Sequence, residues 1–349
     1  MDQLEARSAA ILRTIIREHI STGEPVGSRS ISKKEEIGLS PASIRNIMSD
    51  LKELGYISQP HVSAGRVPTD RGYRFYVDKI GTEGWLNPGE SKVTIESWFG
   101  ESSMDIRDVL RRSSSVLAGL SRQAGVVTSS APREQRFKTI DFIKVSEDRI
   151  VVVLVSCSGF VQNKMIYDED DINQENLERY SRMLNDVLKD LDLRQAKEKI
   201  ETELAKEKTR MDRILAKIMK ISYLVLSQED SREVFIEGQA NFLDEPEFAG
   251  TDQLKALLIT LEEKSRILRI LDKTLEAGGI QIFIGAEHGL DELDACSIVA
   301  YPIRNDDSGL ASISVIGPKR MNYRAVVPLV ITTGEVVTRI AKKIVESTI

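Results

Sequence analysis

The sequence contains few of the residues that form metal centres or covalent cross-links. Its 349 residues include only two cysteines, Cys157 and Cys296, and three histidines, His19, His61 and His288. Their spacing does not match any common set of metal ligands, so we expect no metal and no cofactor. We expect both thiols to be buried and reduced, because structural disulfides are rare in the cytosol.

Long apolar runs and catalytic motifs are also missing. No segment has the length and hydrophobicity of a membrane span, and the N-terminus is charged where a signal peptide is apolar. There is no phosphate-binding glycine loop with Lys-Ser/Thr, no Gly-x-Ser-x-Gly elbow and no His-Glu-x-x-His. Polar groups at Glu287-His288 and at 304–307 lie where turns between strands are expected, which favours a loop role over a catalytic one. We therefore expect a cytoplasmic protein that has no membrane contact and is not an enzyme.

The net charge of −6 is unevenly distributed along the chain. Residues 1–80 contain 12 Lys and Arg against 10 Asp and Glu, which gives +2, and the other 269 residues contain 36 against 44, which gives −8. Basic charge is thus confined to the N-terminal part, where a polyanion could bind. A length of 349 residues with 41% hydrophobic residues predicts a globular protein of two or three domains.

The most informative stretch runs from Ser40 to Asp78. Ser40 followed by Pro41 predicts a helix start, because Ser caps a helix well and Pro is tolerated in its first turn. Gly55 fits the left-handed residue that ends a helix. Apolar residues between these points recur at steps of three and four and predict a buried stripe, formed by Ile44, Ile47, Met48, Leu51 and Leu54.

The other side of this helix carries short or planar groups near its N-terminal end. These residues are Ala42, Ser43, Arg45, Asn46 and Ser49, with no acidic residue before Asp50. Arg can pair with guanine and Asn with adenine in the major groove, so we predict base contacts from the four polar members of this set. Taken alone, the helix favours an ordinary solvated face, and its neighbours reverse that preference.

Those neighbours predict a winged helix-turn-helix. A first helix should end at Thr22-Gly23, and a second should span 28–36 and close at Gly38. Residues 56–59 and 66–67 predict the strands of a wing, with Gly65 at positive φ and Arg66 at the tip. Contacts with the DNA backbone or through the wing are predicted for Arg29, Lys33, Lys34, Ser40, His61, Arg66 and Arg71.

The rest of the chain predicts a linker, a sheet and helices. A linker is expected over 81–100, because the run GTEGWLNPGESK contains glycine, proline and polar residues without an apolar period, and a helix follows over 103–123. Strands are expected at 137–145, 150–156, 160–167, 280–285, 296–303 and 309–316, in one sheet split by an insertion, with a closing helix over 323–345. The helical stretch 173–228 fits a partner-binding surface and packing on its own sheet equally well.

Three long motifs lie in the N-terminal part: GEPVGSRSI (23–31), SPASIRN (40–46) and LKELGYISQPHVSAGRVPTDRGYRFYVD (51–78). Together with EGQANFLDEPEF (237–248) and IGPKRMNY (316–323), they make the chain similar to the bacterial HrcA family of heat-inducible transcription repressors over essentially its whole length. One departure is Ile47, where that family often has an acidic residue. Because Ile47 lies beside the buried stripe, the change concerns helix packing rather than the class of function.

The resemblance implies an α+β multidomain fold. Its parts would be a winged helix-turn-helix over 1–80, a linker over 81–100, a GAF-like α/β sensor domain over 101–172 and 241–349, and an inserted, mainly helical dimerisation segment over 173–240. It also implies a homodimeric repressor of chaperone operons. Such a repressor binds double-stranded DNA at an inverted repeat, the CIRCE element, is kept active by the GroE chaperonin and is lost from DNA on heat shock.

Alternatives remain at this point. One is a ligand-sensing GAF-type regulator, or an enzyme, with an appended winged helix, and another is a winged helix that docks proteins. The sequence offers no convergent ligand site in the GAF-like part, so a small-molecule ligand is not expected.

Overall fold

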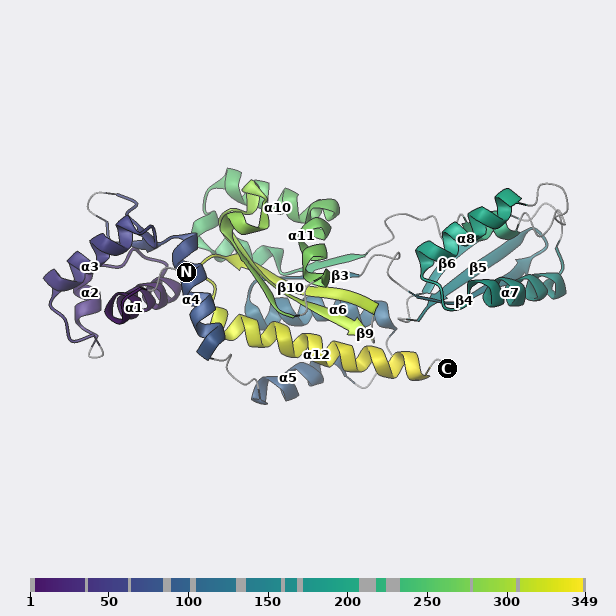
Figure 1. The fold of residues 1–349 in the computed structure, drawn as a ribbon, viewed down its shortest axis with the longest axis horizontal. Helices are drawn as coiled ribbons and strands as arrows, with labels where there is room; N and C mark the ends of the chain where they lie inside the picture. The colour runs from purple at the N-terminus through teal and green to yellow at the C-terminus, as the bar shows by residue number, and fades with distance from the viewer. Residues whose placement is uncertain are drawn as a thin grey trace.

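The computed structural model describes residues 4–34, 37–61, 64–83, 89–100, 105–129, 136–157, 161–167, 172–206, 218–223, 233–276, 279–305 and 308–347. They form three units in a row along an elongated molecule (Figure 1). We call residues 4–83 the N-terminal unit, residues 136–223 the inserted unit, and the remaining described residues the central unit, which lies between the other two. In the described part of the chain, no helix combines the length and apolar character needed to cross a membrane.

The N-terminal unit begins with helices α1 (Ala6–Thr22), α2 (Ser28–Ser32) and α3 (Pro41–Glu53). Helix α3 begins as predicted, since Ser40 Oγ accepts a hydrogen bond from the Ser43 amide at 3.2 Å. Gly55 beyond its end has φ of 76°. Helix α2 is shorter than predicted, because the chain leaves it in a turn closed by the Lys34 amide on the Ile31 carbonyl at 3.0 Å.

A hairpin of β1 (Ile57–Ser58) and β2 (Val67–Pro68) follows α3, and α4 (Asp70–Glu83) comes after it. Val26, just before α2, pairs with Arg66 and adds a third short segment to the hairpin. The predicted positive φ of Gly65 is wrong. Glycine is needed there for close approach, because a Cβ atom would lie 2.6 Å from the Val26 carbonyl oxygen.

Residues 81–100 are not a bare linker, contrary to the prediction. Helix α4 continues to Glu83, and a further helix, α5 (Gly89–Phe99), buries Ile95 and Phe99. It packs against α6 (Ile106–Ser121) and α12 (Tyr323–Ser347), which form where helices were expected. Helix α5 escaped prediction because its few apolar residues give no clear period and the glycine and proline before it suggest a loop.

The described strands of the central unit form one sheet in the order β7-β3-β10-β9-β8. They are β3 (Ala124–Ser129), β7 (Val234–Glu237), β8 (Gln281–Ile284), β9 (Cys296–Asn305) and β10 (Ser308–Pro318), and each pair of neighbours is antiparallel. Helices α6 and α12 cover one face (Figure 1). The other is covered by α11 (Lys264–Glu276), backed by α10 (Thr251–Glu262). Short 3-10 turns complete the unit: η2 (Gln239–Asp244), η3 (Pro246–Phe248), η4 (Gly285–His288) and η5 (Asp291–Leu293).

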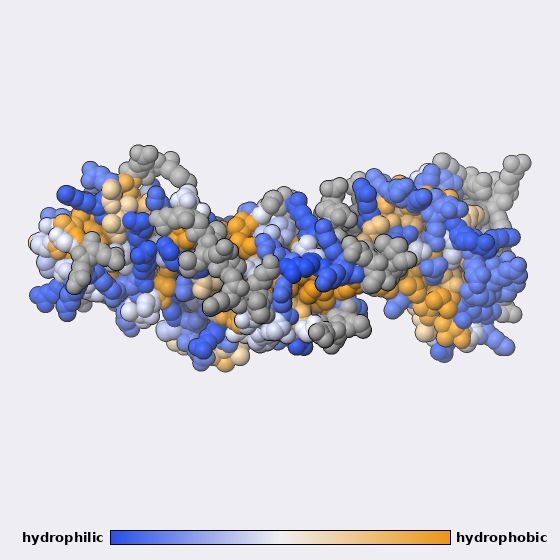
Figure 2. Space-filling view, turned by 90° about the horizontal axis from the view of Figure 1, so that it is seen from below, coloured by the Kyte–Doolittle hydropathy of each residue, from blue (hydrophilic) through white to orange (hydrophobic). Residues whose placement is uncertain are grey.

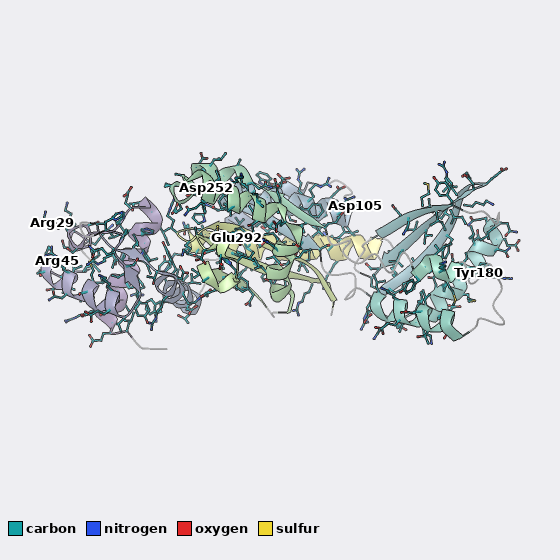
Figure 3. All side chains as sticks on the ribbon, turned by 90° about the horizontal axis from the view of Figure 1, so that it is seen from above. Arg29, Arg45, Asp105, Tyr180, Asp252 and Glu292 are labelled. Atoms are coloured by element: carbon teal, nitrogen blue, oxygen red, sulfur yellow. The ribbon has the colours of Figure 1, made fainter. Side chains whose placement is uncertain are left out.

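The inserted unit has a sheet of its own, which corrects the predicted single sheet. Strands β4 (Phe137–Ser146), β5 (Arg149–Ser156) and β6 (Val161–Tyr167) form a meander. Helices α7 (Gln174–Leu188) and α8 (Leu193–Lys206) cover one of its faces and share a separate hydrophobic core with it (Figure 3).

The bounds of the insertion change accordingly. It begins near residue 136 rather than 173 and includes three strands as well as helices, and residues 234–237, which were assigned to it, pair with β3 in the central sheet. An alternating pattern predicts a strand but not its partner, so β4 to β6 could not be assigned to a sheet. Strand β3 was missed because all six of its residues are buried and show no alternation.

Candidate nucleic-acid interface

Helix α3 presents a polar face at the free end of the N-terminal unit. The four predicted base-reading side chains are all exposed: Ser43, Arg45, Asn46 and Ser49. On the opposite side Ile44, Met48 and Leu51 are buried and Ile47 is half-buried. Leu54, expected in this stripe, is 43% exposed because it follows the last residue of the helix.

The first turn of α3 suits an anionic group. Ser40 and Ser43 are both exposed, and their hydroxyl oxygens lie 3.0 Å apart. The positive end of the helix dipole lies at the same place, so hydroxyl donors and the dipole act together on an acceptor. This geometry favours contact with a DNA phosphate at the helix start.

The basic residues around α3 differ in their partners. Arg29 on α2 and Arg45 on α3 lie at the outer tip of the molecule (Figure 3), and Lys33 is also exposed. Lys34 is already paired, because its Nζ lies 2.7 Å from Glu18 Oε2 on α1. The hydrogen bond from Lys34 lowers the pKa of Glu18, which keeps the carboxylate charged beside the lysine.

Of the two residues predicted to act through the wing, Arg66 lies differently from the prediction. His61 is exposed, and residues 62–63 are outside the described residues. Arg66, predicted at the tip, lies at the base of the wing, where its amide and carbonyl each pair with Val26 at 2.9 Å. This pairing joins residues far apart in sequence and could not be anticipated. Among the described residues, the buried Nε of Arg66 has no hydrogen-bond partner.

Arg71 lies at the opposite end of α3 from the polar face. Its Nη1 donates to the Leu54 carbonyl at 2.8 Å, and its guanidinium lies 4.6 Å from the centroid of the Tyr56 ring. These contacts tie α4 to the end of α3. Arg71 therefore has a structural role, and its contact with a phosphate stays a prediction.

Glu287 and His288 lie in η4 and are engaged in structural contacts. Glu287 accepts hydrogen bonds from Arg74 Nε and from the Ile284 amide, each at 2.9 Å. His288 is buried, with Nε2 3.0 Å from the Leu293 carbonyl oxygen, and burial lowers its pKa. Of the other polar turn, residues 306–307 lie outside the described residues.

The cysteines differ from each other. Cys296 is buried, and burial raises the pKa of its thiol to about 12. Cys157 is exposed just after β5, which corrects the prediction of two buried thiols. Within the described residues, no cluster of three or more His, Cys, Asp or Glu side chains is placed to hold a metal ion.

Comparison with known proteins decides the family. The family model described as the HrcA protein C terminal domain matches residues 107–327. A heat-inducible transcription repressor HrcA of Syntrophobacter fumaroxidans is 41% identical over 345 residues, which cover 98% of this chain and 99% of that protein. The chain belongs to the HrcA family. A second HrcA repressor, from Geobacter sulfurreducens, is 38% identical, and the matched region covers 97% of this chain and 99% of that protein.

A solved structure shares the fold of this HrcA-family chain. It is described as a hypothetical protein. The two structures superpose over 98% of this chain and 100% of the other chain, with a TM-score of 0.64 and 23% sequence identity.

Sequence reasoning missed the association of one group of polar residues in this HrcA-family chain. These residues join the N-terminal unit to the central unit: Asp70, Arg74, Glu287, Lys319 and Arg320. Most of them lie in the stretches 51–78 and 316–323, which carry the family resemblance. A motif does not say which distant residues it meets, so their association could not be predicted.

Proposed function

We propose that this chain is a homodimeric repressor that lowers transcription of chaperone operons by binding an inverted-repeat operator in the cytoplasm. The observation that carries this proposal is the exposed Ser43, Arg45 and Asn46 face on α3, at the free end of the molecule. The order of α2, α3 and the β1–β2 hairpin supports a winged helix-turn-helix. The relatives named heat-inducible transcription repressors support heat shock as the regulated response.

In the proposed complex, the N-terminal half of α3 enters the major groove. Arg45 would pair with a guanine and Asn46 with an adenine, while the short Ser43 and Ser49 side chains allow close approach to the bases. Arg29 and Lys33, neighbours on α2 and at its end, would neutralise phosphates beside the groove. A dimer places two such helices on the two half-sites and blocks access of RNA polymerase.

The inserted unit offers a surface for dimerisation. The face of its sheet that α7 and α8 leave open carries large apolar side chains that are about half exposed or more: Ile143, Val145, Val161, Met165 and Tyr167. The register aligns Ile143, Val151 and Met165 across the three strands, so an apolar row crosses this face beside the row of Asp141, Val153 and Asn163. Figure 2 shows hydrophobic residues gathered along the lower edge of this unit. Patches of this kind are typical of protein interfaces, and we propose a second copy as the partner.

One edge of the same sheet is already blocked. The main-chain amides of Ile140, Phe142 and Lys144 on β4 donate to side chains of α7, at distances of 2.8, 3.3 and 2.9 Å. Such capping prevents a further strand from adding at β4. This supports association through the open face rather than through that edge.

The heat response and the CIRCE operator are part of the same proposal. An apolar sheet face that a partner covers in the dimer becomes exposed when the dimer dissociates. Exposed apolar patches mark interaction sites, so this face gives the proposed chaperonin a physical target. On heat shock, unfolded client proteins would occupy the chaperonin, and the active fraction of the repressor would fall.

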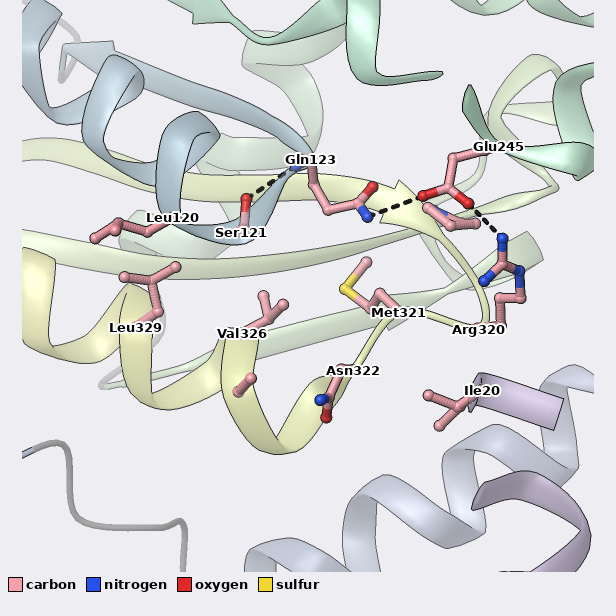
Figure 4. Close-up of a pocket in the computed structure, with 12 residues that line it drawn as sticks. Ile20, Leu120, Ser121, Gln123, Glu245, Arg320, Met321, Asn322, Val326 and Leu329 are labelled. Carbon is pink, nitrogen blue, oxygen red and sulfur yellow. Dashed lines mark hydrogen bonds and ion pairs between the residues drawn. The ribbon is translucent and has the colours of Figure 1, made fainter. Parts of the chain in front are cut away.

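The central unit supports a GAF-like assignment. Its described strands form one antiparallel five-stranded sheet with helices on both faces. A pocket of about 300 Å³ lies between α1, α6 and α12 (Figure 4), with Gln123, Glu245 and Arg320 among its polar lining residues. It favours one second candidate, a ligand-responsive regulator, because Ile20 of the N-terminal unit also lines it. A metabolite that raises the melting temperature and also changes DNA affinity would support this candidate.

The direct test of the proposed function is selection of bound duplexes from a random pool with the full-length chain. The proposal expects an inverted repeat among the selected sequences. Recovery of single, unpaired sites would contradict the dimeric mode of binding, and recovery of no preferred sequence would contradict specific repression altogether.

A further inference from the structure

We infer that a polar joint between the N-terminal and central units is a positioning device that fixes the orientation of α3 for binding both half-sites of an operator. This inference rests on the proposed function and names residues that act on binding without touching DNA. The joint comprises Asp70 and Arg74 of α4 with Lys319, Ala286 and Glu287 of the central unit, and Arg320 against the end of α1.

The first contact of the joint is made by Asp70 at the start of α4. One of its carboxylate oxygens accepts a hydrogen bond from Lys319 Nζ at 2.5 Å, and the other accepts one from the Ala286 amide at 3.4 Å. The site for this carboxylate is shaped by Gly285, which has φ of 54° and whose Cβ position would overlap Asp70. Only glycine combines this backbone conformation with the space for Asp70.

The second contact is made by Arg74, one helical turn further along α4. Its guanidinium forms a two-point pair with the carboxylate of Glu287 and also donates to the Ile282 carbonyl at 2.5 Å. Glu287 is held in turn by the Ile284 amide at 2.9 Å. A planar guanidinium with paired acceptors has a defined direction, so this contact restricts rotation of α4 as well as its distance from the sheet.

The third contact is at the end of α1. Arg320 is paired with both Glu245 and Glu247, and its side chain is only 17% exposed. A Cβ at Gly23 would lie 3.5 Å from Arg320 Nε, so the backbone turn after α1 rests against this guanidinium. Contacts at α1 and at α4 together define the placement of the unit better than either does alone.

Apolar packing lies between these polar contacts. The rings of Tyr73 on α4 and Tyr323 on α12 are buried with centroids 6.4 Å apart. Tyr73 shares a hydrogen bond of 2.7 Å with His19 Nδ1 on α1. The buried residues of the N-terminal unit and this face of the central sheet form one continuous cluster. The units are therefore packed together rather than tethered by a chain segment.

The position of α4 is transmitted directly to α3. Thr69 Oγ1 donates to the Gly55 carbonyl at 2.7 Å, and Arg71 donates to the Leu54 carbonyl at 2.8 Å. Gly72 lies so close to the Tyr56 carbonyl that a Cβ would not fit. A rotation at the joint therefore moves α3, and the displacement is largest at the exposed Arg45 end, which lies farthest from the central unit.

A dimer with rigid joints presents both recognition helices in fixed positions, so binding the second half-site requires little further ordering. Looser joints lose this advantage and tolerate altered half-site spacing. The test uses Lys319→Met with Glu287→Gln, which changes only the central side of the joint and leaves every residue of the N-terminal unit intact. The matched control is Arg339→Met, which removes an ion pair of 2.6 Å between Arg339 on α12 and Glu96 on α5. This pair lies about 24 Å along α12 from Tyr323 and so is remote from the joint.

Three duplexes from the random-pool selection serve as probes: the full inverted repeat, a single half-site, and the repeat with its spacer lengthened by half a helical turn. For the joint variant we expect half-site affinity within about twofold of the parent and full-repeat affinity lower on the order of tenfold, with less discrimination against the long spacer. Arg339→Met should match the parent on all three duplexes. Lys319→Arg, which keeps the charge, should retain most of the parent's spacing preference.

A joint variant with the parent's full-repeat affinity and spacing preference overturns the inference, and so does one that binds the repeat more tightly. If the double variant loses its folded circular dichroism spectrum, the single change Lys319→Met is measured under the same criteria. A parent chain that does not distinguish the repeat from random duplex overturns the proposed function instead, so the two failures are distinct.

Discussion

Arg45 on α3 and Lys33 at the end of α2 are both exposed cations, and their chemistry predicts different contributions to binding. Arg45 lies on the polar face of α3, where a planar two-pronged donor can meet a base edge. Lys33 lies just after α2 and carries a point charge that meets phosphates of any sequence. Substitution of each residue separates specificity from general affinity.

Arg45→Ala should lower operator affinity by about 1 to 3 kcal/mol and relax the preference at one base pair, because the bidentate contact is lost. The measurement is binding to the selected operator and to a set of its single-base-pair variants. Equal losses on operator and random DNA would show that Arg45 contacts only the backbone.

Lys33→Ala should weaken binding to all duplexes by a similar factor and reduce the slope of log affinity against log salt by about one. The matched control is Lys34→Ala. Because Glu18 already neutralises Lys34 at 2.7 Å, the change in slope should be smaller for this variant. Salt titrations of both variants on one duplex provide the comparison, and a larger effect at Lys34 would contradict the assigned roles.

At the scale of elements, local signals predicted local structure well. Ser40-Pro41 fixed the start of α3, and the apolar period predicted its buried side, because capping and amphipathicity act within one or two turns. Pairings between distant segments were not predictable in this way. The Val26–Arg66 bridge, the separate sheet of β4 to β6 and the joint at Asp70 all depend on residues that meet only in the folded chain.

The open face of the inserted sheet yields a prediction about one element. Val161→Lys with Met165→Lys should weaken the proposed dimer by at least about a hundredfold, because each buried apolar side chain contributes about 1.5 to 3 kcal/mol and both copies carry the changes. Both residues are more than half exposed in the single chain, so its folding should be little affected. Analytical ultracentrifugation across a concentration series measures the effect.

Leu243→Lys is the control for this pair, since Leu243 is an equally accessible apolar residue, 66% exposed, on η2 of the central unit. Its dissociation constant should equal that of the parent. If Leu243→Lys dissociates the protein and the strand variant does not, the dimer surface lies on the central unit.

At the scale of the whole molecule, the proposed functions lie at opposite ends. The proposed DNA-reading face on α3 lies at one end, the open sheet face of the inserted unit at the other, and the joint and central sheet between them (Figure 1). The core of the inserted unit is separate from the other cores. Loss of structure or association at that end can therefore remove high-affinity operator binding without unfolding the N-terminal unit.

This arrangement predicts a dependence of repression on both temperature and protein concentration. Operator binding should fall steeply between growth and heat-shock temperatures, since a loss of about 1 to 2 kcal/mol changes the active fraction several-fold. If dissociation of the proposed dimer precedes the loss of binding, the midpoint temperature should rise with protein concentration. Fluorescence anisotropy with labelled operator measures operator binding as a function of temperature. The titrations are made at two protein concentrations, with and without the GroE chaperonin. A midpoint that is independent of concentration would place the heat-sensitive step within a single chain, and an affinity that stays flat over the range would exclude intrinsic heat sensing.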